Sequence, residues 1–353
     1  MRRGVFAQVS ALIAAFGAIL ILSVPVSAKQ PEPAVVGYLA AFKGLETSIA
    51  RIDRAAFTHF NIAFANPDAT GRFVVGDALA CMADEQGTTM TVARLEPIVR
   101  DLQAGGAKVL VSLGGGLIPA CSGDWQALLA PARRAVTIAG LVELVERLGL
   151  DGIDVDLEGV LLTDIDRAGK YVPFVADLSA QMRARGKLLT CATASYEGGM
   201  VPIGSIAYFD LVNVMSYDAI GPTWGPPGAE HSTFAGTERD LDLWLQRGVA
   251  RERLVLGVPF YGYGFGGEQP NWSYRDLAAR LGDAATRGTL IGEACAGCRY
   301  ITFNGPDAIE RKARLAAEIA GGVMVWELSQ DSPDHALTRA IDRGLGRDET
   351  GDD

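Results

Sequence analysis

Short apolar segments alternate with longer stretches of helical periodicity over most of the chain. Each apolar segment spans five to seven residues, which is a typical length for a buried strand. The intervening stretches place apolar side chains three and four residues apart, as on one face of an amphipathic helix. The pattern predicts eight strands, at residues 35–41, 59–65, 108–113, 153–158, 188–192, 211–216, 254–259 and 322–326.

Amphipathic helices are predicted between most of these strands, at residues 92–102, 133–148, 171–185, 238–246 and 308–320. Strands and helices that alternate eight times within about 310 residues predict an α/β protein with a (β/α)8 TIM barrel. An open, doubly wound sheet is the alternative, and its phosphate-binding loop would be the GxGxxG match at residues 262–267. That match is followed by Glu-Gln-Pro-Asn, which does not begin a helix, so the barrel is favoured.

The predicted barrel occupies residues 35–345, after a short Pro-rich linker at 29–34 and before a flexible acidic tail at 346–353. The longest gap between predicted strands, residues 260–321, lies between the seventh and eighth. It contains a CxxC motif and a β-like run at 299–303. We therefore expect an elaborated loop or abbreviated insertion at this position.

The N-terminus has the pattern of a secretory signal peptide. Arg2 and Arg3 precede an apolar run over residues 5–26, which ends in small residues. An uncleaved membrane anchor is the alternative, because the run approaches the ~20 residues that span a bilayer. Pro25 would interrupt such a helix. We therefore expect cleavage after residues 1–28, and a secreted or periplasmic protein that has no membrane contact afterwards.

Composition excludes several classes of protein. The chain of 353 residues is 49% hydrophobic and only 21% charged, which excludes gross disorder. A formal net charge of −10 argues against sequence-independent binding of nucleic acid, which requires a basic surface. The three histidines, His59, His231 and His335, are far apart in the sequence, so a metal site with several histidines is not expected.

Export would allow some of the five cysteines to form disulfide bonds. Cys295 and Cys298 form a CxxC motif without a second copy, which favours a short-range disulfide in a loop over a zinc site. Cys81 and Cys121 both lie in Gly-rich loop context and could form a bridge. Cys191 lies inside an apolar strand-like run, where a buried free thiol is expected.

The fourth predicted strand carries three carboxyl groups on one face. Side chains alternate along a strand, so Asp154, Asp156 and Glu158 point one way and aliphatic residues the other. Like charges this close in a poorly solvated barrel interior cannot all ionise. A solvated acidic edge and a hard-cation site are the alternatives. The aliphatic opposite face favours a catalytic acid whose pKa is raised by neighbouring carboxylates, at the end of the strand where barrel active sites lie.

The DxxDxDxE spacing of this strand resembles the motif of glycoside hydrolase family 18, the chitinase family. Asp151 and Gly152 begin the motif, and Glu158 ends it. Three further segments resemble the family's SxGG, MxYD and eighth-strand tryptophan motifs, in the same order, over most of the chain after the signal peptide. They are Ser112-Leu113-Gly114-Gly115, Met215-Ser216-Tyr217-Asp218 and Val325-Trp326-Glu327.

The resemblance implies retaining hydrolysis of β-1,4-linked N-acetylglucosamine polymers, without metal or organic cofactor, in which the substrate's own 2-acetamido oxygen is the nucleophile. Glu158 would protonate the glycosidic oxygen and then activate water, while Asp156 would orient the acetamido group. Asp154 would share a proton with Asp156, and Tyr217 would hold the acetamido oxygen. The resemblance assigns substrate-binding or supporting positions to Tyr38, Ser112, Met215, Asp218, Trp326 and Phe64, and structural positions to Asp151, Gly152, Gly114 and Gly115. Trp224, in a Pro- and Gly-rich loop after the sixth predicted strand, could stack on a sugar at a neighbouring subsite.

The family also suggests non-proline cis peptides near Ala63-Phe64 and Trp326-Glu327. Phe42, Trp125, Tyr261, Tyr263 and Trp272 are further loop candidates for the cleft, whereas Trp244, inside a helical pattern, is expected in the core. The expected partner is chitin or an N-acetylglucosamine oligosaccharide, bound by a monomer. An endo-β-N-acetylglucosaminidase acting on N-glycans or peptidoglycan-type chains is one alternative. A non-catalytic lectin is another, although such proteins usually lack the glutamate.

Overall fold

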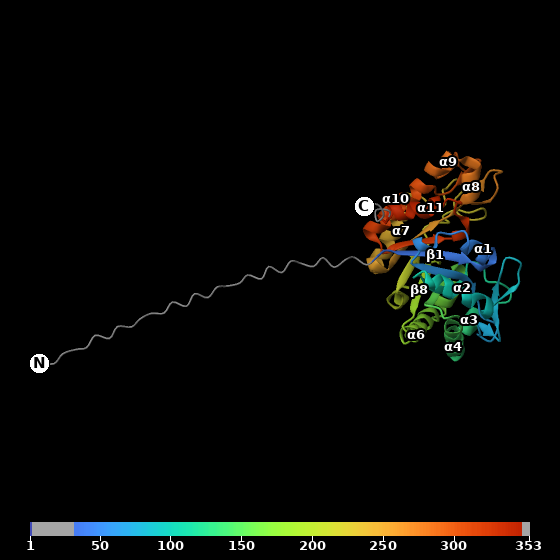
Figure 1. Ribbon diagram of the computed structural model, residues 1–353, viewed down its shortest axis with the longest axis vertical. Coiled ribbons are helices and arrows are strands. Elements are labelled where there is room, and N and C mark those ends of the chain that lie inside the picture. The colour runs from blue at the N-terminus through green and yellow to red at the C-terminus, as the bar shows by residue number, and fades with distance from the viewer. Residues whose placement is uncertain (2–31, 348–353) are drawn as a thin grey trace. The chain divides into compact units, whose positions relative to one another are not determined.

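The structure is a computed structural model that describes Met1 and residues 32–347 (Figure 1). Residues 2–28 of the predicted signal peptide, half of the linker and residues 348–353 of the acidic tail lie outside the described residues. The chain divides into two units, Met1–Glu32 and Pro33–Asp353, and the second contains the fold. Among the described helices, none combines the length and the apolar character that a bilayer crossing requires.

Eight parallel strands close into a barrel, because the last of them pairs with both the first and the seventh. This confirms the predicted (β/α)8 architecture, and each strand lies within two residues of its predicted bounds. The eight strands are β1 (Ala34–Ala40), β2 (His59–Ala65), β6 (Lys108–Gly115), β7 (Gly152–Leu157), β8 (Leu188–Thr193), β9 (Leu211–Val214), β10 (Leu254–Pro259) and β15 (Gly322–Trp326).

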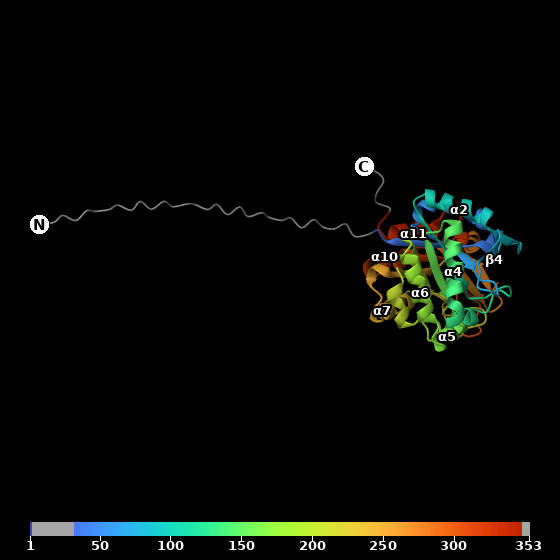
Figure 2. The same ribbon diagram turned by 90° about the horizontal axis from the view of Figure 1, so that it is seen from below.

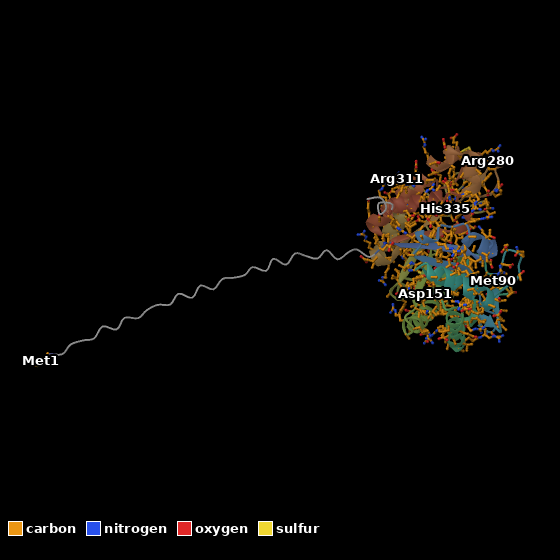
Figure 3. All side chains as sticks on the ribbon, in the orientation of Figure 1. Met1, Met90, Asp151, Arg280, Arg311 and His335 are labelled. Carbon is orange, nitrogen blue, oxygen red and sulfur yellow. A yellow bond between two sulfur atoms is a disulfide. The ribbon has the colours of Figure 1, made fainter. Side chains whose placement is uncertain are left out.

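Helices cover the outside of the barrel (Figure 2). The aliphatic residues of β7, Ile153, Val155 and Leu157, belong to one buried apolar cluster with Leu141 and Leu144 of the adjacent helix α4. Side chains fill the space between the strands and helices (Figure 3). The principal helices are α2 (Val92–Ala104), α4 (Pro131–Leu148), α6 (Tyr171–Arg183), α7 (Phe234–Gln246), α10 (Pro306–Ile319) and α11 (Ala336–Gly344).

The ends of these helices follow from local sequence. Pro131 and Pro306 begin α4 and α10 at positions where the missing N–H is not needed. Thr91 caps α2 by accepting a hydrogen bond from the Arg94 amide at 3.2 Å. Gly149 ends α4 in the left-handed conformation, with φ of 64°.

Two excursions extend the face of the barrel at which the strands end. The first is a three-stranded antiparallel sheet of β3 (Val74–Val75), β4 (Ala78–Ala83) and β5 (Thr89–Thr91), which the sequence pattern did not predict. The second is the expected insertion between the seventh and eighth barrel strands. It contains a sheet of β11 (Tyr261–Phe265), β12 (Asn271–Ser273), β13 (Leu290–Gly292) and β14 (Tyr300–Thr302), with α8 (Tyr274–Leu281) and α9 (Asp283–Arg287).

The insertion also decides against the phosphate-loop alternative. The GxGxxG match begins inside β11, which pairs antiparallel with β12 and β14 and does not lead into a helix. Arg280 of α8 (Figure 3) places its guanidinium 4.8 Å from the centre of the Trp272 ring. Trp272 therefore packs within the insertion.

A close approach between β7 and β8 requires glycine at the start of the acidic strand. A Cβ added to Gly152 would lie 2.2 Å from the carbonyl oxygen of Leu188, and backbone cannot yield as a flexible side chain does. At Gly204, on the surface, the nearest atom to an added Cβ is a Val172 methyl at 3.5 Å, which is an ordinary contact.

We predict that Gly152→Ala destabilises the protein by about 1–3 kcal/mol, as overpacking commonly does. The melting temperature should fall by several degrees, on the order of 5 °C. Gly204→Ala is the matched control and should stay within about 0.5 kcal/mol of the unmodified protein. Equal melting temperatures for the two variants in a calorimetric scan would show that the contact with β8 is not restrictive.

Candidate active site

A cavity of about 530 Å³ opens where the barrel strands end. The side chains that line it come from most of the barrel strands, from the β3–β5 excursion and from the loop after β6. They include Tyr38, Phe42, Phe64, Met82, Leu117, Cys121, Asp156, Glu158, Met215, Tyr217, Asp218 and Trp326.

The alternation of side chains along β7 brings its carboxyl groups to the interior of the barrel. Asp154 is fully buried beneath the cavity, and Asp156, two residues later, lines it. Glu158 follows the strand, at the N-cap of helix α5 (Gly159–Arg167), and also lines the cavity. The three carboxyl groups thus form a series from the barrel core to the cavity, as the strand pattern predicted.

Asp154 is held by four donors from four other strands of the barrel. Its Oδ2 accepts hydrogen bonds from the hydroxyls of Tyr38 and Ser112, at 2.7 and 2.8 Å. Its Oδ1 accepts from the Thr190 hydroxyl at 2.6 Å and the Asn213 amide at 3.4 Å. Burial raises the pKa of Asp154, and these hydrogen bonds oppose that effect because they stabilise the carboxylate.

Asp156 has a different environment. Among the described residues none donates a hydrogen bond to its Oδ1, although that oxygen is buried. Burial raises the pKa of Asp156 well above its usual value, and the negative charges of Glu158 and Asp154 raise it further. Asp156 is thus the member of the series best suited to hold a proton, and its Oδ1 can accept a hydrogen bond from a ligand.

Burial raises the pKa of Glu158 to about 7, and the negative charge of Asp218 raises it in the same direction. The sequence attributed the raised pKa to the neighbouring carboxylates of the same strand. For Glu158 burial is the larger cause, and the charge that contributes is that of Asp218, in the segment after β9. The neighbouring carboxyl groups of β7 do interact, because the charge of Glu158 raises the pKa of Asp156. A carboxylic acid with a pKa near 7 can both donate and accept a proton at neutral pH.

Asp218 follows Tyr217 in the segment after β9 and has a left-handed backbone, with φ of 62°. Its Oδ1 accepts hydrogen bonds from the hydroxyls of Tyr261 and Tyr263, at 2.6 and 3.1 Å. Burial raises the pKa of the Tyr217 hydroxyl well above its usual value, so this group is a neutral donor. Tyr261 and Tyr263, expected as loop aromatics, are instead buried supports of Asp218.

Aromatic rings form one side of the cavity. Trp326 stacks on Phe64 with 5.5 Å between ring centroids, and Phe64 stacks on Phe42 at 6.3 Å. Tyr38 meets Trp326 edge-on at 5.4 Å. The peptide bonds Ala63–Phe64 and Trp326–Glu327 are both cis, as the family resemblance suggested. Such a set of ring faces offers an apolar surface for a flat ligand.

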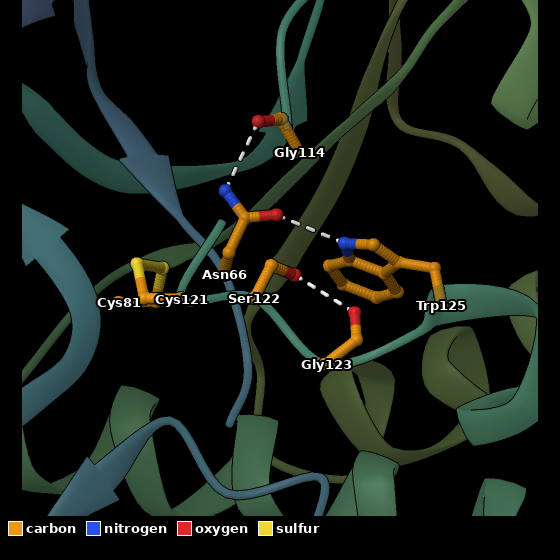
Figure 4. Close-up of a disulfide and its surroundings, with 7 residues drawn as sticks. All are labelled: Asn66, Cys81, Gly114, Cys121, Ser122, Gly123 and Trp125. Atoms are coloured by element: carbon orange, nitrogen blue, oxygen red, sulfur yellow. Dashed lines mark hydrogen bonds between the residues drawn. A yellow bond between two sulfur atoms is a disulfide. The ribbon is translucent and has the colours of Figure 1, made fainter. Parts of the chain in front are cut away.

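A disulfide bond joins the two segments that form another wall of the cavity. Cys81 of β4 and Cys121 of the loop after β6 are bonded, as the sequence allowed (Figure 4). Beside them the Asn66 amide donates to the Gly114 carbonyl oxygen at 3.1 Å and accepts from the Trp125 indole at 2.9 Å. The other two expectations are also confirmed, because the CxxC pair is a disulfide and Cys191 is free and buried.

The structure corrects the placement of several predicted contacts. Trp125 begins the short helix α3 (Trp125–Leu128), is 1% exposed and packs against Phe73 and Phe174, so it cannot contact a ligand. Trp272 packs under Arg280, as described above. Ser112, expected to support Asp154 or bind substrate, is fully buried and does only the first.

Trp224 is 46% exposed but is not among the cavity-lining residues. Its indole donates to the Asp218 carbonyl oxygen at 3.0 Å, and its ring meets Tyr263 edge-on. It therefore lies just outside the cavity, beside Asp218. Trp244 is fully buried, as expected for a core residue of α7.

The four predicted structural residues lie around these groups. Asp151 accepts hydrogen bonds from the Val109 amide at 3.0 Å and from the Gln103 side chain, which ties the start of β7 to β6 and α2. Gly114 and Gly115 have φ near 90°, and added Cβ atoms would meet the Asp156 carbonyl oxygen and the Phe64 ring.

Sequence reasoning missed Tyr196, which follows β8 and is 61% exposed. Burial raises the pKa of Tyr196, and the negative charges of Glu158 and Asp218 raise it further. Thr190 and Asn213, which contact Asp154, were also missed. Each of these two residues could have been found as the polar, inward-facing position of a largely apolar strand, Thr190 in β8 and Asn213 in β9.

The chemistry that the cavity offers is proton transfer between carboxyl groups beside an aromatic surface. In residues 32–347, histidine, cysteine, aspartate and glutamate side chains form no group of three that could hold a metal ion. A ligand that presents an amide N–H to Asp156 and an oxygen to Glu158 would satisfy both groups.

The comparisons with known proteins agree with this geometry. The model of glycosyl hydrolases family 18 matches residues 34–331. A class V chitinase from Arabidopsis thaliana is 27% identical over 350 residues, which cover 85% of this chain and 86% of the relative. The chain therefore belongs to glycosyl hydrolases family 18, and the protein is a chitinase-like O-glycosyl hydrolase.

Solved structures show the same fold. A family 18 chitinase from the chitin utilization locus of Flavobacterium johnsoniae has a TM-score of 0.71 and 29% sequence identity, over 89% of this chain and 94% of that one. A class V chitinase from Nicotiana tobaccum has a TM-score of 0.71 and 21% identity, over 89% of this chain and 99% of that one.

We predict that one glutamate carboxyl group titrates near pH 7 and that Glu158→Gln removes this titration. Burial and the Asp218 charge disfavour the ionised form, which moves the pKa of Glu158 upward from 4.5 to about 7. Carbon-13 NMR of glutamate-labelled protein measures the pKa of this carboxyl group directly. If every glutamate titrates below about pH 5, close to the ordinary range, the proposed environment of Glu158 is wrong.

Proposed function

We propose that this protein is a secreted chitinase that hydrolyses β-1,4-linked N-acetylglucosamine polymers, with retention of configuration and with the substrate's acetamido oxygen as the nucleophile. The observation that carries the proposal concerns Asp156, which lines the same cavity as Glu158, Tyr217 and Trp326 and whose Oδ1 has no hydrogen-bond partner within the described part of the chain. An acetamido group supplies the N–H that Asp156 lacks and an oxygen that Tyr217 can hold.

Glu158 performs two steps in this proposal. As a neutral acid it protonates the glycosidic oxygen while the acetamido oxygen attacks the anomeric carbon and closes an oxazolinium ion. As the resulting carboxylate it takes a proton from water, which opens that ion and restores the acid. A pKa of about 7 suits both steps at neutral pH.

Asp154 and Asp156 support the positive charge that develops on the acetamido nitrogen. Four hydrogen bonds favour the charged form of Asp154. The ionised form of Asp156 is less favourable than that of Asp154 in the free protein. It becomes favourable when the substrate N–H donates to Asp156 and positive charge develops beside it. Asp156 then carries the negative charge at the reacting centre, and the proton moves toward Asp154.

The sugar that reacts would lie on Trp326, whose ring faces the cavity beside Phe64. Glu158 directly follows β7, which is on the opposite side of the barrel from the Trp326 strand, so the leaving sugar would lie toward β7 and β8. Tyr196, which follows β8, and Trp224, which follows β9, are exposed and are proposed to contact it.

A solved relative supports the substrate class. The class V chitinase from Nicotiana tobaccum was crystallised in complex with NAG4. Two disulfide bonds and the apolar N-terminal run support export and signal cleavage. We propose that the exported protein acts as a monomer.

We predict that Glu158→Gln lowers kcat on a chromogenic chitobioside by about 10²–10⁴-fold, because the amide cannot donate the proton to the leaving oxygen. Binding should persist, since the amide has the same shape. Glu143→Gln, on the outer face of α4, is the matched control and should leave kcat unchanged. Near-normal turnover by Glu158→Gln would exclude Glu158 as the acid.

We also predict that cleavage requires the 2-acetamido group. Oligosaccharides with a hydroxyl or a free amine at this position lack the nucleophile and should not be cleaved, which product analysis by NMR measures. Comparable rates on a glucan oligosaccharide would contradict the mechanism. Faster release of N-glycans than cleavage of chitin oligosaccharides would instead identify the alternative endo-β-N-acetylglucosaminidase activity.

A further inference from the structure

His231 lies beside Asp218, is not among the residues that line the cavity, and is fully buried. Its backbone is fixed from two directions. Its carbonyl oxygen accepts a hydrogen bond from the Ala219 amide at 3.0 Å, next to Asp218. Its own amide donates to the Thr302 hydroxyl of β14 at 3.2 Å. The loop between β9 and α7 thus folds back on itself, so that His231 near its end lies against Asp218 and Ala219 near its start.

The imidazole of His231 completes a cage of three rings around one carboxylate oxygen. Its centroid is 5.4 Å from the Tyr261 ring and 5.3 Å from the Tyr263 ring. Its Nδ1 is 3.7 Å from the Asp218 oxygen that both tyrosine hydroxyls contact. This distance is longer than a hydrogen bond, so the interaction is electrostatic. Among the described residues, neither imidazole nitrogen has a hydrogen-bond partner, and such a buried polar group calls for an explanation.

Charged groups reach His231 from several elements. Burial lowers the pKa of His231, Asp218 and Glu230 raise it, and Lys312 of α10 lowers it. Lys312 is itself buried and donates to Ser232, the next residue along the chain, at 2.7 and 2.8 Å. The tyrosines of β11 remain neutral because their pKa values are raised. The lowered pKa keeps the imidazole uncharged at neutral pH.

We propose that His231 is a positioning residue that acts through Asp218: its neutral imidazole, with the two tyrosines, holds the Asp218 carboxylate beside Glu158 without cancelling its charge. An arginine or lysine in this place would form an ion pair and remove that charge from the cavity. The negative charge of Asp218 raises the pKa of Glu158. His231 therefore helps to keep the acid protonated, and this role rests on the function proposed above.

The kinetic test is a double-mutant cycle with His231→Phe, which keeps a ring in the cage but removes its nitrogens. In the unmodified background this change should lower kcat/KM about tenfold and move the alkaline limb of the pH profile to lower pH. In an Asp218→Asn background it should cause no further loss, because the residue that it acts through is already neutral. Equal losses in both backgrounds would overturn the proposal.

His59→Phe is the matched control, because His59 begins β2 at the opposite end of the barrel. This substitution should change neither kcat/KM nor the pH profile. A shift of the alkaline limb equal to that of His231→Phe would show that the effect is not specific to the cage, and would overturn the proposal.

A second measurement does not depend on activity or on the folding of His231→Phe. The chain has only three histidines, so proton–nitrogen NMR can follow the titration of each. The pKa of His231 should lie below 6.5 and should fall further in Asp218→Asn, because the negative charge that raises it is lost. An unchanged pKa in that variant would overturn the proposal. If Asp218→Asn lowers the pKa of His231 but no chitin oligosaccharide is cleaved, the proposed function is wrong, whereas the interaction between His231 and Asp218 is confirmed.

Discussion

The burial of three carboxyl groups along one strand is the constraint on which the site depends. Two-residue alternation on β7 directs Asp154, Asp156 and Glu158 into the barrel, and the aliphatic residues between them secure the strand to the helices. Burial alone would neutralise all three groups. Other strands of the barrel supply four donors to Asp154 and none to Asp156 Oδ1, so the same strand provides one group suited to charge and one suited to a proton.

Additions to the barrel complete the cavity that the barrel strands line. The β3–β5 excursion and its disulfide to the loop after β6 form one wall. The insertion after β10 supplies the two tyrosines that hold Asp218, and Asp218 in turn acts on Glu158. The insertion therefore contributes to the electrostatics of the carboxyl groups although it provides none of them. This arrangement links the chemistry on β7 to a segment about a hundred residues away in the sequence.

The sequence predicted the barrel because each buried strand is a short apolar run, and β7 because its period of two is unusually regular. It did not predict β3–β5, because β3 and β5 have only two and three residues and β4 contains no β-branched or aromatic residue. The prediction that Trp125 lies in a loop of the cleft was wrong, because Trp125 follows a Gly-rich segment and the short helix that buries it was not recognised. The contribution of Asp218 to the pKa of Glu158 required the three-dimensional structure, since Glu158 follows β7 and Asp218 lies in the segment after β9.

The central claim is that the proton positions differ along the carboxyl series, and neutron diffraction measures them most directly. On crystals exchanged into deuterated buffer below the pKa of about 7 for Glu158, the account predicts deuterium on Glu158 and on Asp156 and an ionised Asp154. Bare carboxylates at both Glu158 and Asp156, or deuterium on Asp154 alone, would contradict it.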